Sequence, residues 1–223
     1  MNSDTRLQLW EFIDKIVYIN LDHRQDRRDV MTKFFEEGGM PLDKIVRFSA
    51  IKHAKGAIGC LASHTEVLRM AKREGWKNVL ILEDDLQWIN LESGYQQLLE
   101  LIAKPKWDVI LLCGWYKIYE FPRVFDSLNT GAYLVNSDYY DTFLANREWA
   151  LRNIGKPINI FSKIRSYAAD VSWRYPMQKD TWYCLYPCIC SQIDDYSDNS
   201  KAVIKASLAV GIFDKAVKNS IWR

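Results

Sequence analysis

The chain of 223 residues lacks a surplus of charge of either sign, because 30 lysines and arginines stand against 28 aspartates and glutamates. A nucleic-acid-binding domain usually carries a basic surplus or a basic face. Nucleic acid is therefore not expected as a partner. Almost half of the residues are hydrophobic, and charges of both signs are mixed along the chain. This composition is typical of a globular protein with a substantial core.

Long hydrophobic runs are also missing. The longest, Val79 to Leu82 and Val109 to Cys113, have the length of strands and are far too short to cross a bilayer. Residues 1–10 contain no hydrophobic segment of the kind found in signal peptides, and no Asn-x-Ser/Thr acceptor occurs. The cysteines number five, an odd count. These features together favour a reducing, cytoplasmic location.

Three of the cysteines, Cys184, Cys188 and Cys190, lie close together but lack the usual zinc spacings. No CxxC pair occurs and no histidine lies nearby. We therefore expect buried thiols on a strand rather than a metal site.

The hydrophobic pattern predicts strands that alternate with helices. Strands are expected over residues 15–20, 44–48, 78–82, 107–113 and 131–136, and helices over 26–37, 59–74, 91–103 and 137–149. A late strand over 183–190 is expected at an edge, because Pro187 cannot donate to a ladder. The alternation favours the α/β class, with a mainly parallel, Rossmann-like sheet flanked by helices. No repeat or linker interrupts the pattern, so one domain over 1–223 is expected.

Three adjacent carboxylates, Glu83, Asp84 and Asp85, follow the predicted strand 78–82. Such neighbours repel one another unless a cation offsets their charge, and Mg²⁺ and Mn²⁺ prefer carboxylate oxygens. Ligands of open α/β sheets bind beyond the carboxyl ends of strands, where this triplet lies. Alternation places Glu83 and Asp85 on one face and Asp84 on the other. We predict Asp85 as the first metal ligand and Asp84 as the second, with Glu83 or Asp84 holding the ribose or a metal-bound water. An exposed acidic turn or helix cap is the alternative.

Three segments, in matching order and spacing, resemble glycosyltransferase family 25, which contains lipopolysaccharide-biosynthesis glycosyltransferases and procollagen galactosyltransferases. They are Val-Tyr-Ile-Asn-Leu-Asp at 17–22 with Arg24, Arg27 and Arg28, the GxxGCxxSH pattern at 56–64, and Ile-Leu-Glu-Asp-Asp-Leu at 81–86. The resemblance covers roughly residues 16–136 well and the last third only loosely.

The resemblance implies a GT-A fold, a UDP-sugar donor, Mn²⁺ or Mg²⁺ as cofactor, and inversion at the anomeric carbon. Galactose or glucose is the favoured sugar, and a hydroxyl of a glycan, glycolipid or hydroxylysine-type acceptor would receive it. The donor half would span about 14–136 and the acceptor half about 137–223. The metal would neutralise the diphosphate leaving group, and one base would take the acceptor proton.

The family pattern also implies roles for single residues. Asn20 and Leu21 are expected to line the uridine pocket, and Arg27 to pair with phosphate or ribose. Alternatively, Arg27 forms a solvated charged helix face with Arg24 and Arg28. Ser63 and His64 are expected to contact the donor, although a histidine on the same helical face as two leucines is also typical of a core. A hydrolase triad is disfavoured, because adjacent helical residues point in different directions and no GxSxG elbow is present.

The last third supplies the remaining candidates. Asp170 is the expected base, with a helix N-cap as the alternative. Gln192, followed by Asp194 and Asp195, is expected to complete the donor site, unless these residues form an ordinary polar loop. Three tryptophans (Trp115, Trp173 and Trp182) would stack on an acceptor sugar or pack in the core. The basic amphipathic segment 201–223 would rest on an anionic membrane surface or pack as a helix.

Two other functions stay open at this point, as does the oligomeric state. A metal-dependent nucleotidyl or phosphoryl transfer enzyme would use similar carboxylates, but it usually needs a glycine-rich phosphate loop, and neither GxGxxG nor GxxxxGK[ST] occurs. An inactive family member that only binds a UDP-sugar is the second alternative.

Overall fold

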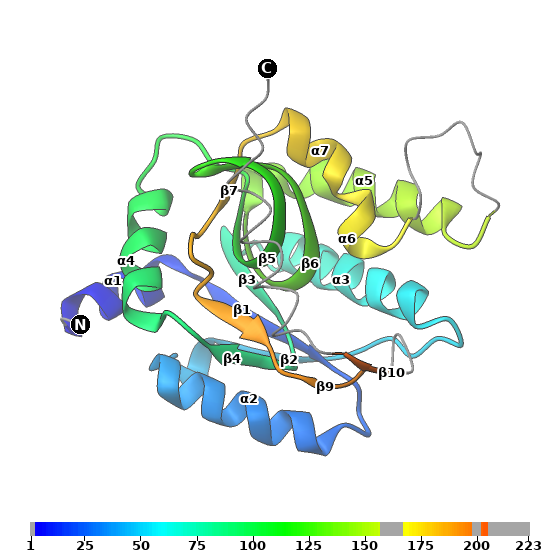
Figure 1. Cartoon of the computed structure of the whole chain (residues 1–223), viewed down its shortest axis with the longest axis horizontal. Helices are drawn as coiled ribbons and strands as arrows, with labels where there is room; N and C mark the ends of the chain where they lie inside the picture. The colour runs from blue at the N-terminus through cyan, green and yellow to red at the C-terminus, as the bar shows by residue number, and fades with distance from the viewer. Residues whose placement is uncertain (1–2, 157–166, 198–201, 205–223) are drawn as a thin grey trace.

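The computed structural model describes residues 3–156, 167–197 and 202–204, and in this part of the chain a six-stranded sheet has helices on both faces (Figure 1). Its strands are β1 (Lys15–Asn20), β2 (Ile45–Ser49), β3 (Asn78–Glu83), β5 (Val109–Glu120), β6 (Arg123–Asn136) and β7 (Trp182–Cys184). Two smaller sheets pair β4 (Leu86–Trp88) with β8 (Cys190–Gln192), and β9 (Asp195–Ser197) with β10 (Ala202–Ile204).

The helices fill the connections between strands. They are α1 (Ser3–Phe12), α2 (Gln25–Gly38), α3 (Gly56–Arg73), α4 (Leu91–Ile102), α5 (Tyr140–Asn153), α6 (Ala169–Ser172) and α7 (Arg174–Lys179), with short 3₁₀ turns η1 (Leu42–Lys44) and η2 (Ser137–Tyr139). No described helix is long and apolar enough to cross a membrane.

The sheet has the order β2-β1-β3-β6-β5-β7. The pairs β1–β2, β1–β3 and β5–β7 are parallel, and β6 alone runs against its neighbours β3 and β5. The predicted α/β class with a mainly parallel sheet flanked by helices is thus confirmed. Because β1 and β3 are adjacent and parallel, their carboxyl ends lie side by side, and this edge positions the site.

Strands β5 and β6 form a long hairpin that the sequence pattern predicted only in part. The prediction of two short strands over 107–113 and 131–136 is wrong in extent. The first strand continues to Glu120, the second begins at Arg123, and the two remain paired up to these residues. The turn between them contains only Phe121 and Pro122. Four register shifts interrupt the pairing, which hides the regular alternation that marks a strand.

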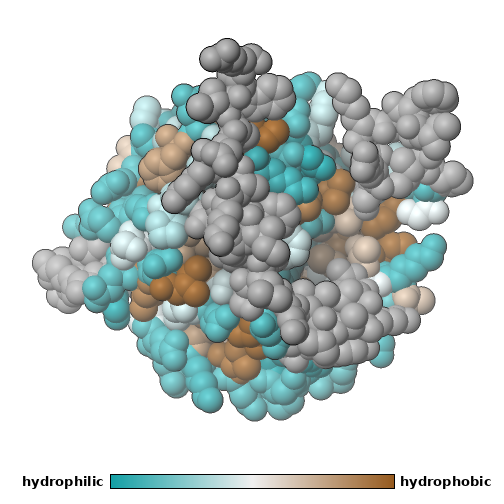
Figure 2. Space-filling model, in the orientation of Figure 1, coloured by the Kyte–Doolittle hydropathy of each residue, from teal (hydrophilic) through white to brown (hydrophobic). Residues whose placement is uncertain are grey.

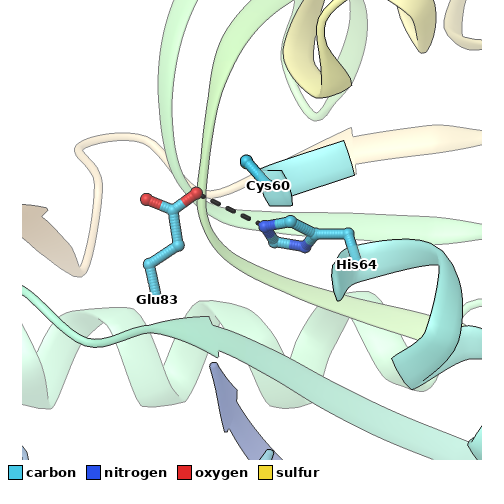
Figure 3. A group of neighbouring side chains, drawn as sticks. All are labelled: Cys60, His64 and Glu83. Carbon is cyan, nitrogen blue, oxygen red and sulfur yellow. Dashed lines mark ion pairs between the residues drawn. The ribbon is translucent and has the colours of Figure 1, made fainter. Parts of the chain in front are cut away.

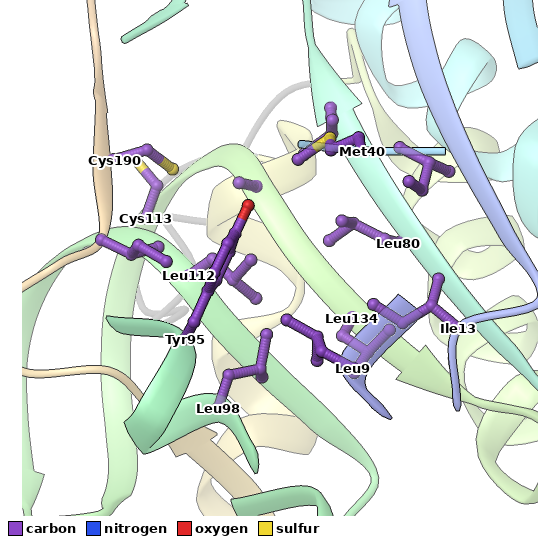
Figure 4. Packing of buried hydrophobic residues seen from close by; sticks show 14 of the residues in the cluster. Leu9, Ile13, Met40, Leu80, Tyr95, Leu98, Leu112, Cys113, Leu134 and Cys190 are labelled. Atoms are coloured by element: carbon purple, nitrogen blue, oxygen red, sulfur yellow. The ribbon is translucent and has the colours of Figure 1, made fainter. Parts of the chain in front are cut away.

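Two hydrophobic layers hold the sheet between the helices, and alternate residues of each strand serve opposite layers. Ile16 and Leu80 face the layer formed with α1, α2 and α4, part of which is shown in Figure 4. Val17 and Ile81 face the layer formed with α3, α5 and α7. Burial on both faces explains why these strands are nearly continuous apolar runs rather than alternating ones.

The end regions differ most from the sequence prediction. Helix α1 was not predicted, and it buries Leu9 and Ile13 in the first layer. The predicted strand 183–190 is wrong as one element, because β7 and β8 belong to different sheets and Pro187, which has no N–H, lies between them. Apart from β10, the segment 201–223 lies outside the described residues.

The predicted burial of the three cysteines is confirmed, but their placement on one strand is wrong, because Cys184 ends β7, Cys190 begins β8 and Cys188 lies between the two strands. All five thiols are free, and Cys184, Cys188 and Cys190 are buried. Their burial in apolar surroundings agrees with a packing role.

The surface seen in Figure 2 is mostly hydrophilic, with smaller hydrophobic areas between. Exposed large apolar side chains of the described chain come from separate elements rather than one region; they are Leu7, Leu42, Ile51, Ile89, Phe121 and Tyr175. Scattered residues of this kind are normal on a soluble surface.

Gly59 in the second motif is required by a close backbone approach. A methyl group at this position would lie 2.4 Å from the carbonyl oxygen of Ile51. The hydroxyl of Ser63 accepts a hydrogen bond of 2.8 Å from the Ile51 amide and donates one of 2.7 Å to the Gly59 carbonyl. Gly59 and Ser63 therefore hold the segment before α3 against the helix.

We predict that Gly59→Ala lowers the free energy of unfolding by about 1–3 kcal/mol, because the added methyl must displace backbone. In a helix interior without such a contact, the same substitution stabilises by roughly 0.5–1 kcal/mol. The sign of the change in the free energy of unfolding, measured by urea denaturation, therefore distinguishes a close backbone contact at Gly59 from an open helix interior. A more stable variant would contradict the close approach.

Candidate active site

The acidic triplet lies in the turn between β3 and β4. Glu83 is the last residue of β3, Asp84 and Asp85 form the turn, and Leu86 begins β4. Because β4 pairs with β8, Leu86 lies opposite Gln192, and the Ile193 amide donates a 2.7 Å hydrogen bond to the Asp85 carbonyl. The last third of the chain is thus bound directly to the acidic turn.

Asp84 is neutralised by side chains from β1 and α2. Its Oδ1 lies 2.7 Å from Nη1 of Arg27, and its Oδ2 accepts a 2.7 Å hydrogen bond from Nδ2 of Asn20. All three residues are buried. Burial raises the pKa of Asp84 in spite of Arg27. Both carboxylate oxygens therefore have partners within the protein.

Glu83 and Asp85 share a partner in Gln192, whereas Asp84 and Asp85 share Arg27, so these contacts do not set Asp84 apart from the other two as the alternation predicted. Nε2 of Gln192 donates to Glu83 Oε2 at 2.7 Å and to Asp85 Oδ1 at 3.1 Å. Arg27 Nη1 lies 3.2 Å from Asp85 Oδ2, a longer contact than its bond to Asp84. Burial, and then the charge of Glu83, raise the pKa of Asp85 to about 7. Asp85 is thus the carboxylate least stabilised by the protein itself.

Asn129 connects this cluster to the candidate base. Its Nδ2 donates to Gln192 Oε1 at 2.8 Å, and its backbone amide donates to Asp170 Oδ2 at 3.2 Å. The residue has a φ of +78°, a left-handed conformation that asparagine tolerates better than most residues. Asp170, in the first turn of α6, is half-buried, and burial raises its pKa. Ala168, rather than Asp170, occupies the N-cap position.

A basic group surrounds the carboxyl end of β1. Asn20 Oδ1 accepts hydrogen bonds from Arg28 at 2.9 Å and from Arg47 at 3.1 Å. Arg47 also pairs with the exposed Asp22, whose pKa is lowered by its hydrogen bonds to Arg47 and Ser49. Leu21, between Asn20 and Asp22, is half-buried. Positive charge therefore accompanies the two residues that were predicted to line a uridine pocket.

His64 is buried beside the acidic turn, on the helical face predicted with Leu61 and Leu68. Its Nδ1 lies 2.7 Å from the Tyr133 hydroxyl, and its Nε2 lies 3.4 Å from Glu83 Oε1, as Figure 3 shows for the second contact. Burial lowers the pKa of His64, so the neutral ring is favoured. With Tyr133 donating to Nδ1, the Nε2–H donates toward Glu83.

The positions of several other residues can be compared with the roles predicted for them. Ser63 uses its hydroxyl for bonds to Ile51 and Gly59, so the donor contact expected of it has no geometric support. Trp173 and Trp182 are completely buried, which corrects the idea that they stack on a sugar. Trp115 is half-buried, and Asp194 is exposed on the loop after β8.

Sequence reasoning did not single out four residues that belong to this region. Asn129 and Arg47 form the links described above, and Thr130 donates a short hydrogen bond to Glu83. Arg147 on α5 is completely buried, donates to the carbonyl of Ala169 in α6, and lies 4.5 Å from the centre of the Phe143 ring. No spacing signal marks them, because each comes from an element distant in sequence.

The donor chemistry of the turn fits a hard divalent cation at Asp85. A partly exposed carboxylate with a raised pKa, beside two more carboxylates and one arginine, gains most from an added positive charge. Asp84 fits less well, because its contacts with Arg27 and Asn20, 2.7 Å each, are shorter than the contacts of 3.1 and 3.2 Å that Asp85 makes with Gln192 and Arg27. Of the two predicted ligands, the geometry therefore favours Asp85.

Comparison with known proteins agrees with the motifs. Residues 49–142 match the sequence profile of glycosyltransferase family 25 (LPS biosynthesis protein). This segment, which is less than half of the chain, is therefore similar to glycosyltransferase family 25, and the match supports the resemblance. The matched segment contains the second motif (56–64) and the third motif (81–86), whereas the opening motif (17–22) precedes it. A Drosophila melanogaster protein described as "Glycosyltransferase 25 family member" is 33% identical over a region covering 34% of this chain and 16% of that protein. The matched region therefore spans about one sixth of the relative's length.

Two solved structures are similar at low identity. One, a glycosyltransferase involved in the glycosylation of the major capsid of PBCV-1, has 7% identity and a TM-score of 0.49, covering 90% of this chain and 98% of its own. The other, A197 from STIV, has 13% identity and a TM-score of 0.48, covering 85% and 93%. With TM-scores below 0.5, neither likeness establishes a common fold.

We predict that Arg27→Met destabilises the protein by about 3–5 kcal/mol, because it leaves Asp84 buried without its cation. Adding Asp84→Asn should recover part of this loss by removing the unpaired charge. Urea denaturation of the wild type, both single variants and the double variant measures the coupling. A loss below about 1 kcal/mol, typical of surface pairs, would contradict the buried role of this pair.

We predict that Asp85→Asn stabilises the metal-free protein at pH 8 and that this gain disappears at pH 4. In the unfolded chain Asp85 loses its proton near its ordinary pKa of 3.8, but in the folded protein only near pH 7. The folded state therefore loses stability, through the ionisation of Asp85, as the pH rises from 3.8 to about 7. Melting temperatures of both proteins in EDTA, measured from pH 4 to 8, test this. A difference independent of pH would argue against a raised pKa.

Proposed function

We propose that the chain is an inverting glycosyltransferase of GT-A type. It transfers a hexose, galactose or glucose, from a UDP-sugar to a hydroxyl of a glycan, glycolipid or hydroxylysine-type acceptor, with Mn²⁺ or Mg²⁺ at Asp85. The observation that carries the proposal is the division of the acidic turn into one carboxylate with short contacts, Asp84, and one with longer contacts, Asp85. Asp84 makes two contacts of 2.7 Å, with Arg27 and Asn20, whereas the contacts of Asp85 with Gln192 and Arg27 measure 3.1 and 3.2 Å. Asp85 is therefore the carboxylate that we assign to a cation, at the carboxyl edge of the sheet and within the segment that matches the family 25 model.

The donor is supported by the residues around this edge. A bound cation supplies charge neutralisation for a diphosphate leaving group. Arg28 and Arg47 place positive charge beside Asn20 and Leu21, where the nucleotide would lie. Glu83, oriented by Gln192 and His64, is available for the hydroxyl groups of the ribose or the sugar.

The base is supported by position and by environment. Asp170 is connected to Gln192 through Asn129, so it belongs to the same network as Asp85. Its raised pKa moves a carboxylate toward the range in which it takes a proton effectively. Inversion requires one such base, which would accept the proton of the acceptor hydroxyl as that oxygen attacks the anomeric carbon.

A thermal-shift screen tests the donor and metal assignments. UDP-sugars with Mn²⁺ should raise the melting temperature, since a ligand at about 100 times its Kd stabilises by about 2.7 kcal/mol. Asp85→Asn should lose the metal-dependent part of the shift. The matched control is Asp138→Asn, which changes an exposed carboxylate at the other end of the sheet. Stabilisation by nucleoside triphosphates but by no UDP compound would reject the proposal.

Turnover tests the base. Asp170→Asn should lower kcat for sugar transfer by about 10²–10⁴-fold while UDP binding is retained, because only the proton acceptor is removed. Donor binding is measured in the same protein by calorimetry. Full transfer activity in Asp170→Asn would show that another group is the base.

A further inference from the structure

A second group of potential metal ligands, different in chemistry from Asp85, lies at the start of α3. The sulfur of Cys60, a ring nitrogen of His64 and a carboxylate oxygen of Glu83 all lie within 4.8 Å of one another. Figure 3 shows His64 and Glu83 directed toward each other, with Cys60 beside them. Cys60 and His64 are four residues apart on one helix, so they share a face, and Glu83 ends the neighbouring strand β3.

The separation of His64 and Glu83 suits two ligands of a tetrahedral ion. Zinc binds imidazole nitrogen and carboxylate oxygen at about 2.0–2.2 Å, which puts two such ligands about 3.4 Å apart at the tetrahedral angle. His64 Nε2 and Glu83 Oε1 are 3.4 Å apart. Cys60 and Glu83 are partly exposed, whereas His64 is buried.

The surrounding side chains orient these groups as metal ligands are usually oriented. The Tyr133 hydroxyl, 2.7 Å from His64 Nδ1, turns Nε2 toward Glu83 and accepts the Nδ1–H of the other tautomer. Thr130 and Gln192 hold the carboxylate of Glu83. Such outer partners fix the ring orientation and tautomer of metal-binding histidines.

We propose that Cys60, His64 and Glu83 form a binding site for a thiophilic divalent cation of the Zn²⁺ or Co²⁺ type. Thiolate and imidazole ligands select such ions, whereas carboxylate and water select Mg²⁺ and Mn²⁺. The chain therefore carries two neighbouring sites of different selectivity, one at Asp85 and one at Cys60. This inference stands on geometry and ligand chemistry, although the site shares Glu83 with the proposed donor site.

Cobalt titration of the full chain tests the site. After dialysis against a chelator, Co²⁺ should produce a near-ultraviolet thiolate-to-cobalt charge-transfer band that saturates at one ion per chain and is removed by Zn²⁺. Cys60→Ser should abolish the band. The matched control Cys188→Ser and the acidic-site variant Asp85→Asn should retain it. No band in the wild type, or a full band in Cys60→Ser, would overturn the proposal.

Two further measurements exclude a folding defect as the cause. Tyr133→Phe keeps the ring but removes the hydroxyl, and it should weaken Co²⁺ binding by about 10–100-fold. In the wild type, Zn²⁺ should slow alkylation of Cys60, read by peptide mass spectrometry. Unchanged alkylation, or unchanged affinity in Tyr133→Phe, would count against the site. A cobalt band in a chain without UDP-sugar binding would reject only the proposed function.

Discussion

The buried pair of Arg27 and Asp84 is the interaction on which the rest of the site depends. Three adjacent carboxylates cannot all remain charged in a partly dry turn without compensation. Arg27, supplied by α2, and Asn20, supplied by β1, satisfy the middle carboxylate completely. The two other carboxylates share the amide of Gln192, and Asp85 has only a longer contact of 3.2 Å with Arg27. An otherwise repulsive sequence thereby becomes a site with one residue, Asp85, in need of an external cation.

This division also joins distant parts of the chain. Gln192 from β8 bonds to both Glu83 and Asp85, and Asn129 from β6 bonds to Gln192 and Asp170. The proposed metal ligand and the proposed base thus belong to one hydrogen-bonded network. Buried networks of this kind restrict their members to one arrangement, which is what positioning a donor and an acceptor requires.

The parts of the fold set by local pattern were predictable from sequence, and the parts set by long-range contact were not. Strand β1 and the end of β3 follow from apolar runs, whereas the alternation of side chains did not predict that Arg27 contacts both Asp84 and Asp85. The full length of the β5–β6 hairpin was not predicted, because register shifts interrupt the alternation of its side chains. Asn129 was not predicted as a site residue, because its role depends on a left-handed backbone conformation and on hydrogen-bond partners more than 40 residues away in the sequence.

The most direct test of the divided acidic turn is electron paramagnetic resonance of Mn²⁺ with UDP present. We predict that the wild type removes one Mn²⁺ per chain from the free-ion signal only when UDP is present. Asp85→Asn should leave the signal of the free ion unchanged under the same conditions. Equal binding of Mn²⁺ by the wild type and Asp85→Asn would contradict the claim that Asp85 holds the metal.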